Sequence, residues 1–350
     1  MTTLLVRPGR RSAAAATRPP AYSGGQYLAV VGFMAAAAVL VPLLISSDAN
    51  QYRANLWLVY AMAALGFYWV FGLGGRFAFC QTLMMTVGGY TSAYVTSKLG
   101  PEWFLFGLFS AMVVCAVLAG IVGALTARAQ DFYFAIATLA VSEIGTVVFE
   151  KGGGPLGPDG TVTSISIPQI GHTVILSNRG TFWLFLIILG LLLFLGAFLE
   201  RSPVRRLAIA ARENGQVAAT LGVPVVRLQL GLFMLGSAAG GLSGALIGHW
   251  NGVTEANSFG MELSIGIFLM LLLGGLRSMW GPIVGAAFYV GIPQVLNGLD
   301  KYEQIVYGGL LLLVIILVPQ GLVDAASRGA RAGWRATRRR PQPSPGGNDA

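Results

Sequence analysis

Long apolar runs separated by short polar segments fill most of this 350-residue chain. Runs of about 18 to 20 apolar residues are long enough to cross a bilayer as helices, and they lack the alternation of membrane β-strands. The pattern therefore predicts an all-α fold, a polytopic transmembrane helical bundle of about 8–10 spans. The candidate spans are 27–47, 54–73, 77–97, 103–126, 132–149, 181–199, 229–250, 262–276, 281–298 and 303–319.

The composition agrees with a membrane protein and argues against an enzyme. Hydrophobic residues make up 55% of the chain and charged residues 11%, whereas soluble domains carry about 25% charged residues. Cys80 and Cys115 lie in apolar segments, and His172 and His249 are far apart, without a carboxylate cluster beside them. The sequence therefore predicts no catalytic residue, no metal site and no cofactor on this chain.

The basic residues indicate how the chain is oriented in the membrane. The net charge of +9 is concentrated near both termini and in 201–227, which is typical of a topology signal, so no nucleic-acid partner is expected. With ten spans, eighteen basic residues fall on the side of the termini and five on the other side. The positive-inside rule then predicts that both termini are cytoplasmic and that the loops 150–180 and 251–261 face outward.

Three regions follow from this pattern. Residues 1–26 form a basic tail, residues 27–322 form the membrane domain, and residues 323–350 form a second basic tail. Both tails are expected to be disordered, because they are rich in arginine and poor in large apolar residues. The first apolar run is longer than the core of a cleavable signal peptide, so we interpret it as an uncleaved span.

The segment 200–228 interrupts the apolar runs with the stretch PVRRLAIAARENGQVAATLGVP. Ser202 and Pro203 are typical of a helix start, and Gly222 followed by Pro224 is typical of a helix end. Gly215 predicts a break that divides the segment into two short helices.

One face of this helical segment is apolar but consists mostly of alanine. Two hypotheses fit such a face: the helix lies on anionic lipid, or it docks against another protein. Alanine binds a membrane weakly and permits close approach, which favours docking. The residues of this face are Leu207, Ala210, Ala211, Ala218 and Leu221.

This segment resembles the cytoplasmic coupling loop of ATP-binding-cassette importer permeases, and more closely that of the branched-chain amino acid uptake family, the LivM type. The likeness continues through FMLGSAAGGLSGALIG, SFGMELSIGIFLMLLLGGLRSMWGPIVGAAF and YGGLLLLVIILVPQGL, and it covers about 72–322 with gaps. The resemblance implies that this loop docks in a cleft of an ATPase subunit. The residues expected to carry that coupling are Arg205, Arg212, Glu213, Asn214, Ala218, Gly222 and Arg277.

The same resemblance implies the partners and the location. A second homologous permease, two ATPase subunits and an extracytoplasmic solute-binding protein are expected, in the bacterial cytoplasmic membrane. The chain itself has no G-x-x-x-x-G-K-[ST] sequence, so ATP hydrolysis is expected on separate chains. The sequence departs from the family pattern at Gln81, Gly215 and Arg277, and it does not identify the solute beyond branched-chain amino acids or a related small polar molecule.

Several residues inside the spans are candidates for the substrate path, and each has a purely structural alternative. Paired glycines in a short span suggest a discontinuous helix, and a glycine row every four residues suggests a smooth groove, but both also suit close helix packing. A carboxylate within a span suggests either a polar point on the path or a buried packing contact. The candidates are Gly88, Gly89, Tyr90, Glu143, Gly240 and Gly244.

Two rival functions were considered. An ion-coupled secondary transporter would use Glu143 and would need no ATPase, so the segment 200–228 would be a linker. An intramembrane enzyme or scaffold is disfavoured by the lack of a paired catalytic constellation in the spans.

Overall fold

The computed structural model describes residues 25–44, 47–127, 129, 131–151, 160–163, 165, 168–170, 173–174, 177–296, 308–309 and 321–323. Nearly all of the two predicted tails and of the tenth predicted span lie outside these residues, as does part of the loop 150–180. The boundaries proposed for the two tails therefore remain predictions.

Each of the first nine predicted spans is a helix in the part of the chain that the structure describes. The span helices are α1 (Gly25–Leu44), α2 (Asp48–Phe67), α3 (Gln81–Leu99), α4 (Phe104–Leu125), α5 (Asp131–Lys151), α6 (Asn178–Arg201), α9 (Val225–Asn251), α10 (Met261–Gly274) and α11 (Gly281–Leu296). Six of them, α2, α4, α5, α6, α9 and α10, are long and apolar enough to cross a membrane. For α2, α4 and α10, the apolar length includes an adjoining short helix.

Shorter elements adjoin these helices. A π-helix, η1 (Tyr68–Leu73), extends α2, while 3-10 turns η2 (Pro101–Trp103) and η5 (Asn257–Phe259) precede α4 and α10. Two short helices, α7 (Pro203–Glu213) and α8 (Gly215–Thr220), connect α6 to α9. The prediction of two short helices in this segment is therefore confirmed.

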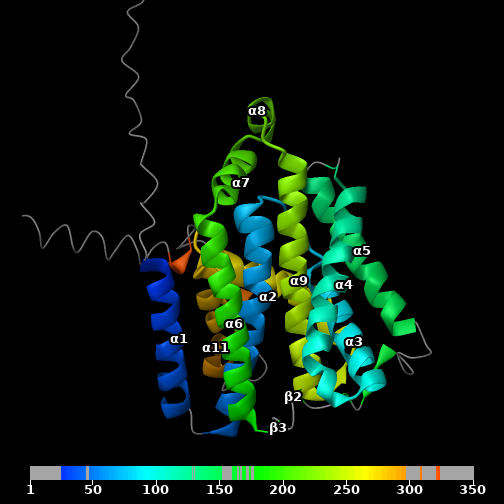
Figure 1. Cartoon of the computed structure of the whole chain (residues 1–350), viewed down its shortest axis with the longest axis vertical. Coiled ribbons are helices and arrows are strands. Elements are labelled where there is room, and N and C mark those ends of the chain that lie inside the picture. The colour runs from blue at the N-terminus through cyan, green and yellow to red at the C-terminus, as the bar shows by residue number, and fades with distance from the viewer. Residues whose placement is uncertain are drawn as a thin grey trace, which may run out of the picture.

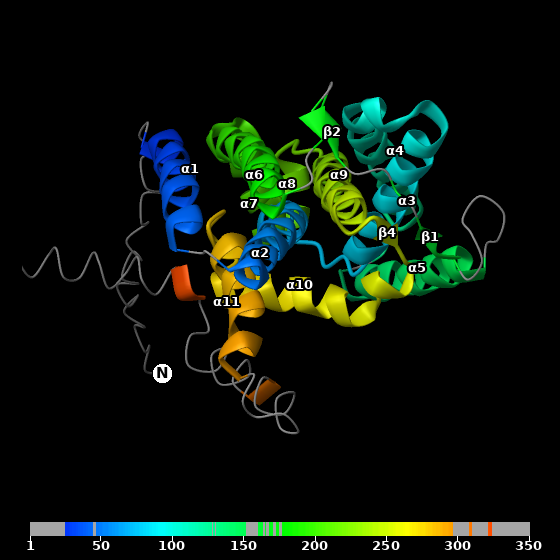
Figure 2. The same cartoon turned by 90° about the horizontal axis from the view of Figure 1, so that it is seen from below.

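Helix α9 lies at the centre of the bundle, where it packs against α2, α3 and α4 (Figure 1). Helix α6 covers the far side of α2, and α1 packs against α6. Helices α10 and α11 pack against each other and against α2. Figure 2 shows α5 and α10 along their length, so both are tilted away from the direction of α9.

Glycines let the central helices approach until their backbones touch. A Cβ atom at Gly236 would overlap the carbonyl oxygen of Gly66, and a Cβ atom at Gly244 would overlap that of Met85. Gly88 on α3 lies equally close to the backbone of Gly241 on α9. Small residues permit this close packing in membrane helices, where apolar burial alone gives little preference for one neighbour.

The connecting segments gather at opposite ends of the bundle. Figure 1 shows α7 and α8 at one end and the strands β2 (Gln169–Ile170) and β3 (Thr173–Val174) at the other. At this second end, β1 (Val162–Thr163) pairs antiparallel with β4 (Val253–Thr254). The two loops that were predicted to share the outer side are thus joined directly, through short strands that the apolar pattern did not predict.

Candidate functional site

The α7–α8 loop is built by local signals in its own sequence. Pro203 occupies the first turn of α7, and the chain breaks at Asn214, which has φ −155° and ψ 91°. The side chain of Asn214 accepts a hydrogen bond from the Val217 N–H and so caps α8. Gly222 then adopts φ +82°, which a residue with a side chain rarely tolerates, and the chain turns into α9.

The break at Asn214 divides the alanine-rich face that the sequence predicted. Ala211 and Ala218 are buried by the chain itself, whereas Leu221 is 79% exposed. Val217, one turn before it, is 53% exposed. Burial is therefore not uniform over the predicted face, because Ala211 and Ala218 pack against the chain whereas Leu207, Ala210 and Leu221 are exposed. Val217 lies on α8 and Leu221 follows its last residue, and Figure 1 shows α8 at the end of the loop farthest from the bundle.

Arg212 connects this loop to the membrane domain. Its Nη1 donates a hydrogen bond of 2.6 Å to the carbonyl oxygen of Gly72 in η1, and its guanidinium lies 5.8 Å from the centre of the Phe71 ring. A hydrogen bond from a charged donor is among the stronger ones in proteins. Gln229 of α9 donates to the carbonyl oxygen of Gly74, which adds a second contact at the same end of α2.

A cavity of about 380 Å³ lies between the loop and the bundle. It brings together Arg205, Arg212 and Glu213 from α7 with Arg277 from the turn between α10 and α11. The structure thus gathers four of the predicted coupling residues around one space. Asn214, Ala218 and Gly222 instead shape α8 and its exit.

The glycines that were considered for a substrate path lie at helix contacts. A Cβ atom added to Gly88 or to Gly244 would collide with backbone atoms across the α3–α9 interface. A Cβ atom added to Gly240 would lie 2.7 Å from Gln81 Nε2. Gly89 faces Thr254 at 3.0 Å by the same measure. Helix α3 is continuous through both of its central glycines, so the hypothesis of a discontinuous helix was wrong. Close packing is the reading that these contacts support.

Tyr90 connects α3 to the loop beyond α5. Its hydroxyl donates a hydrogen bond to the carbonyl oxygen of Gly160, and its ring stacks on Phe149 with ring centres 4.7 Å apart. Tyr90 is buried, and these contacts connect α3 to α5 and to the segment at Gly160.

Gln81 is a buried residue whose contacts the sequence did not reveal. Its amide nitrogen donates to the carbonyl oxygens of Ala63 and Gly236, each at 3.1 Å. One side chain therefore joins α3 to both α2 and α9. The only local signal was a polar residue at the start of an apolar helix, which is also typical of an exposed helix end.

Glu143 lies on a face of α5 that is exposed among the residues that the structure describes. It lines a cavity of about 140 Å³ together with Ser142 and, from α10, Ser264. Its neighbours on α5, including Ile144 and Val147, are also exposed. The hypothesis of a carboxylate buried by packing within this chain was therefore wrong, since Glu143 is exposed in the isolated chain.

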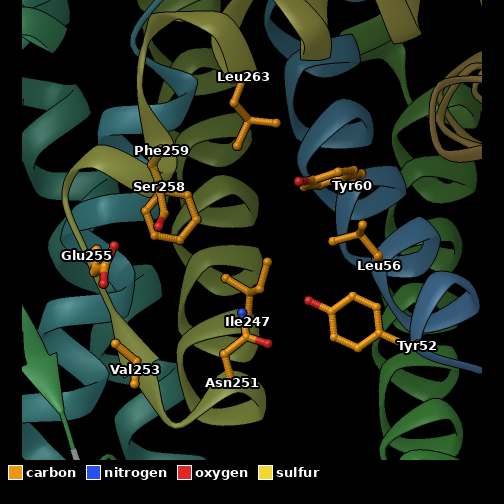
Figure 3. A pocket seen from close by; sticks show the side chains of 10 residues that line it. All are labelled: Tyr52, Leu56, Tyr60, Ile247, Asn251, Val253, Glu255, Ser258, Phe259 and Leu263. Atoms are coloured by element: carbon orange, nitrogen blue, oxygen red, sulfur yellow. The ribbon is translucent and has the colours of Figure 1, made fainter. Parts of the chain in front are cut away.

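A further cavity of about 370 Å³ opens at the end of the bundle where α2 begins and α9 ends (Figure 3). Its walls come from α2, α9, η5 and the first turn of α10, so no local motif in the sequence announced it. Figure 3 shows the hydroxyls of Tyr52 and Tyr60 directed toward the space between α2 and α9. The lining residues are Tyr52, Leu56, Tyr60, Ile247, Asn251, Val253, Glu255, Ser258, Phe259 and Leu263.

Comparison with known proteins identifies the family. A family model described as "Branched-chain amino acid transport system / permease component" matches residues 51–315. This chain belongs to that family. The matched region of the permease runs from α2 past α11 and includes the α7–α8 loop and every residue proposed for a site.

Individual relatives agree with this assignment. The permease is 26% identical over 313 residues to the high-affinity branched-chain amino acid transport system permease protein LivM of Escherichia coli, covering 82% of this chain and 72% of the relative. It is 28% identical over 279 residues to a probable LivM permease of Methanocaldococcus jannaschii, covering 72% and 77%. LivH of Escherichia coli is 25% identical over 294 residues, covering 75% and 91%. No solved structure gives a significant match.

Proposed function

We propose that this permease is the membrane subunit of an ATP-binding-cassette importer that moves branched-chain amino acids, or a related small polar solute, across the bacterial cytoplasmic membrane. The observation that carries the proposal is the α7–α8 loop, which projects from one end of the bundle and presents an exposed apolar tip (Figure 1). An exposed apolar surface of this kind on a basic segment suits a protein partner better than bulk water.

The tip of the loop would dock into the ATPase, while its base is held by the membrane domain. Val217 and Leu221 would supply the apolar contact, and Glu213 and Asn214, which directly precede α8, are also exposed. Arg212 holds the base through the carbonyl oxygen of Gly72. Movement of the docked tip would therefore pull on η1 and on α2, because Arg212 is hydrogen-bonded to η1 directly.

Each of the remaining partners would bind a different surface of the bundle. The exposed face of α5 with Glu143 would contact the second permease, because a carboxylate within a span is costly against lipid and is stable against protein or water. Between the two subunits Glu143 would form a polar point on the substrate path. The end of the bundle with β1 and β4 would receive the solute-binding protein, and two ATPase chains would hydrolyse ATP, so this chain needs no cofactor of its own.

An ion-coupled transporter remains the alternative that Glu143 suggests, but family membership favours the importer. Such a transporter would not need an exposed apolar tip on the loop between α6 and α9.

Co-purification tests the proposal. The permease would be expressed with the second permease and the ATPases encoded beside it, as the native chain and as the double variant Val217→Asp and Leu221→Asp. Buried apolar anchors at interfaces often contribute 2 kcal/mol or more, so we expect at least about 30-fold less bound ATPase in the double variant. Val226→Asp, the same change at an exposed valine in the first turn of α9, serves as the control.

The outcomes separate the two functions. Retention of the ATPase by the native chain and by Val226→Asp, with loss from the double variant, supports an importer subunit. If no ATPase binds the native chain and the chain alone moves solute down an ion gradient, the importer proposal is wrong.

A further inference from the structure

The cavity between α2, α9, η5 and α10 is large enough to hold a small ligand. It lies at the end of the bundle opposite to the α7–α8 loop (Figure 1). Its volume of about 370 Å³ falls within the range of about 300–1,000 Å³ that is typical of ligand sites. Such sites are lined mainly by apolar side chains, with a few polar groups that fix the orientation of the ligand. Five of the ten side chains that line this cavity are apolar, and five carry polar groups, so it can offer a ligand both kinds of contact.

The apolar part of the lining is well supported by the fold. Leu56, Ile247 and Leu263 come from three different helices and meet around one space, and Phe259 closes one side. Ile247 and Phe259 are themselves buried, so they form fixed walls. An aliphatic side chain of a ligand would gain apolar contact on several sides.

The polar part of the lining combines one carboxylate with neutral hydrogen-bonding groups. Glu255 lies in the segment after β4, on the opposite side of the space from Tyr52 and Tyr60 (Figure 3). Ser258 and Asn251 add a hydroxyl and a side-chain amide. None of the ten residues that line the cavity is basic.

We propose that this cavity is a binding site for a free zwitterionic amino acid with an aliphatic side chain. The Glu255 carboxylate would pair with the ammonium group, and the hydroxyls of Tyr52, Tyr60 and Ser258 would donate hydrogen bonds to the ligand carboxylate. Leu56, Ile247 and Leu263 would contact the aliphatic side chain. The inference rests on the proposed importer function and adds to it a location for the solute within a single permease chain.

The chemistry of the lining sets the specificity. An acidic amino acid would place a second negative charge near Glu255 without a basic residue of the lining to balance it. A molecule without an ammonium group would leave the Glu255 carboxylate without its partner. N-acetyl-leucine keeps the aliphatic side chain and the carboxylate of leucine but lacks the ammonium, so it should bind far more weakly.

The aromatic walls are positioned before any ligand arrives. The ring of Tyr52 packs on Trp250 with ring centres 4.5 Å apart, and the ring of Tyr60 meets that of Tyr289 edge-on at 6.0 Å. Donors that are already oriented lose less conformational entropy when a ligand binds. Both tyrosines lie on α2, and η1, which extends α2, carries the contact between Gly72 and Arg212. One helix therefore connects the proposed solute site to the loop that would bind the ATPase.

Cysteine protection tests the site directly. Ser258 is exposed and lines the cavity, whereas the native Cys80 and Cys115 are buried, so Ser258→Cys introduces one accessible thiol. The complete transporter would be reconstituted in nanodiscs and treated with a membrane-impermeant maleimide. Leucine at ten times its dissociation constant should lower the labelling rate about tenfold, and glutamate or N-acetyl-leucine at the same concentration should not. Glu102→Cys, an exposed position in η2 outside the cavity, is the control and should be labelled equally with and without leucine.

Uptake kinetics provide an independent measurement. The same complex in proteoliposomes, supplied with binding protein and ATP, would be compared with Glu255→Gln and with the control Glu102→Gln. Loss of a hydrogen bond to a charged group should raise the KM of Glu255→Gln for leucine at least about tenfold, with little change in the control. Unaltered ATPase co-purification shows that the variant is assembled.

The outcomes distinguish this inference from the proposed function. If the native complex transports leucine but leucine does not protect Ser258→Cys and Glu255→Gln keeps the native KM, the site is wrong and the importer stands. If leucine protects the thiol but no ATP-driven uptake occurs, the site stands and the importer proposal is wrong.

Discussion

Helices α9 and α5 are similarly apolar, yet they differ strongly in their surroundings. In the apolar stretch of α9, 78% of the residues are buried within the chain, and for α2 with η1 the share is 83%. In the corresponding stretch of α5, the share is 17%. Apolarity therefore identifies a helix that can enter the membrane, but it does not identify what surrounds the helix there.

The difference follows from shape and charge. Helix α9 carries glycines that other backbones contact directly, and a glycine surface is useful only if another helix approaches it. Helix α5 carries bulky exposed side chains such as Ile144 and, midway along the helix, the exposed carboxylate of Glu143. We infer that α9 is held by the fold of this chain, whereas α5 is held by lipid and by a neighbouring subunit.

The largest effect should come from enlarging a glycine of the core. In Gly244→Leu, the new side chain overlaps the Met85 carbonyl, so α3 and α9 must separate. Overpacking commonly costs about 1–3 kcal/mol, and more where a backbone must move, so the melting temperature in detergent should fall at least about 5 °C. Gly231→Leu on the same helix is the control, because a Cβ atom there meets nothing within 4 Å. Equal melting temperatures for the two variants would contradict the packing of α9 described above.

Changing Glu143 tests the other side of the comparison. Because Glu143 is exposed in the isolated chain, Glu143→Leu should leave the melting temperature of the purified subunit unchanged. In the assembled transporter, loss of a charged hydrogen-bonding group should lower the uptake rate about tenfold. Ile144→Leu, an apolar change on the same helix, should leave uptake intact. Native uptake by Glu143→Leu would assign Glu143 a minor role at a water-facing surface.

Arg212 should affect coupling and not assembly. In Arg212→Ala the hydrogen bond to the Gly72 carbonyl is lost, but the exposed tip of α8 is unchanged. We expect the ATPase to co-purify normally while substrate-stimulated ATP hydrolysis falls roughly three- to tenfold, which corresponds to the loss of about one hydrogen bond. The control is Arg206→Ala, an exposed arginine on the same helix. Loss of the bound ATPase from Arg212→Ala would instead show that Arg212 belongs to the surface that docks on the ATPase.

The smallest effect is expected for Gln81, even though it is buried. Its amide contacts Ala63 and Gly236 across two interfaces, but interhelical hydrogen bonds in membrane proteins contribute only about 0.6 kcal/mol on average. Gln81→Leu has a similar volume, so the melting temperature should fall by about 2 °C. A drop as large as that of Gly244→Leu would show that hydrogen bonds, and not backbone contact, hold the core.

The sequence alone determined the class of fold, the spans and the local design of the long loop. Continuous apolar runs decide membrane insertion residue by residue, and Pro203, Asn214 and Gly222 act within a few residues of their own position. The family motifs, which are short continuous stretches of sequence, indicated the same permease family that the comparison identified.

Only the tertiary structure decided which of the glycines pack, which apolar faces stay bare, and where a solute site lies. The sequence left both a path and packing open for Gly88 and Gly244, and the contact between α3 and α9 supports packing. Tyr60, Ile247 and Glu255 are distant in sequence and belong to different elements, so no pattern within one segment relates them. The physical reason is that apolarity and helix signals act along the chain, whereas cavities and close contacts depend on how the helices pack in three dimensions.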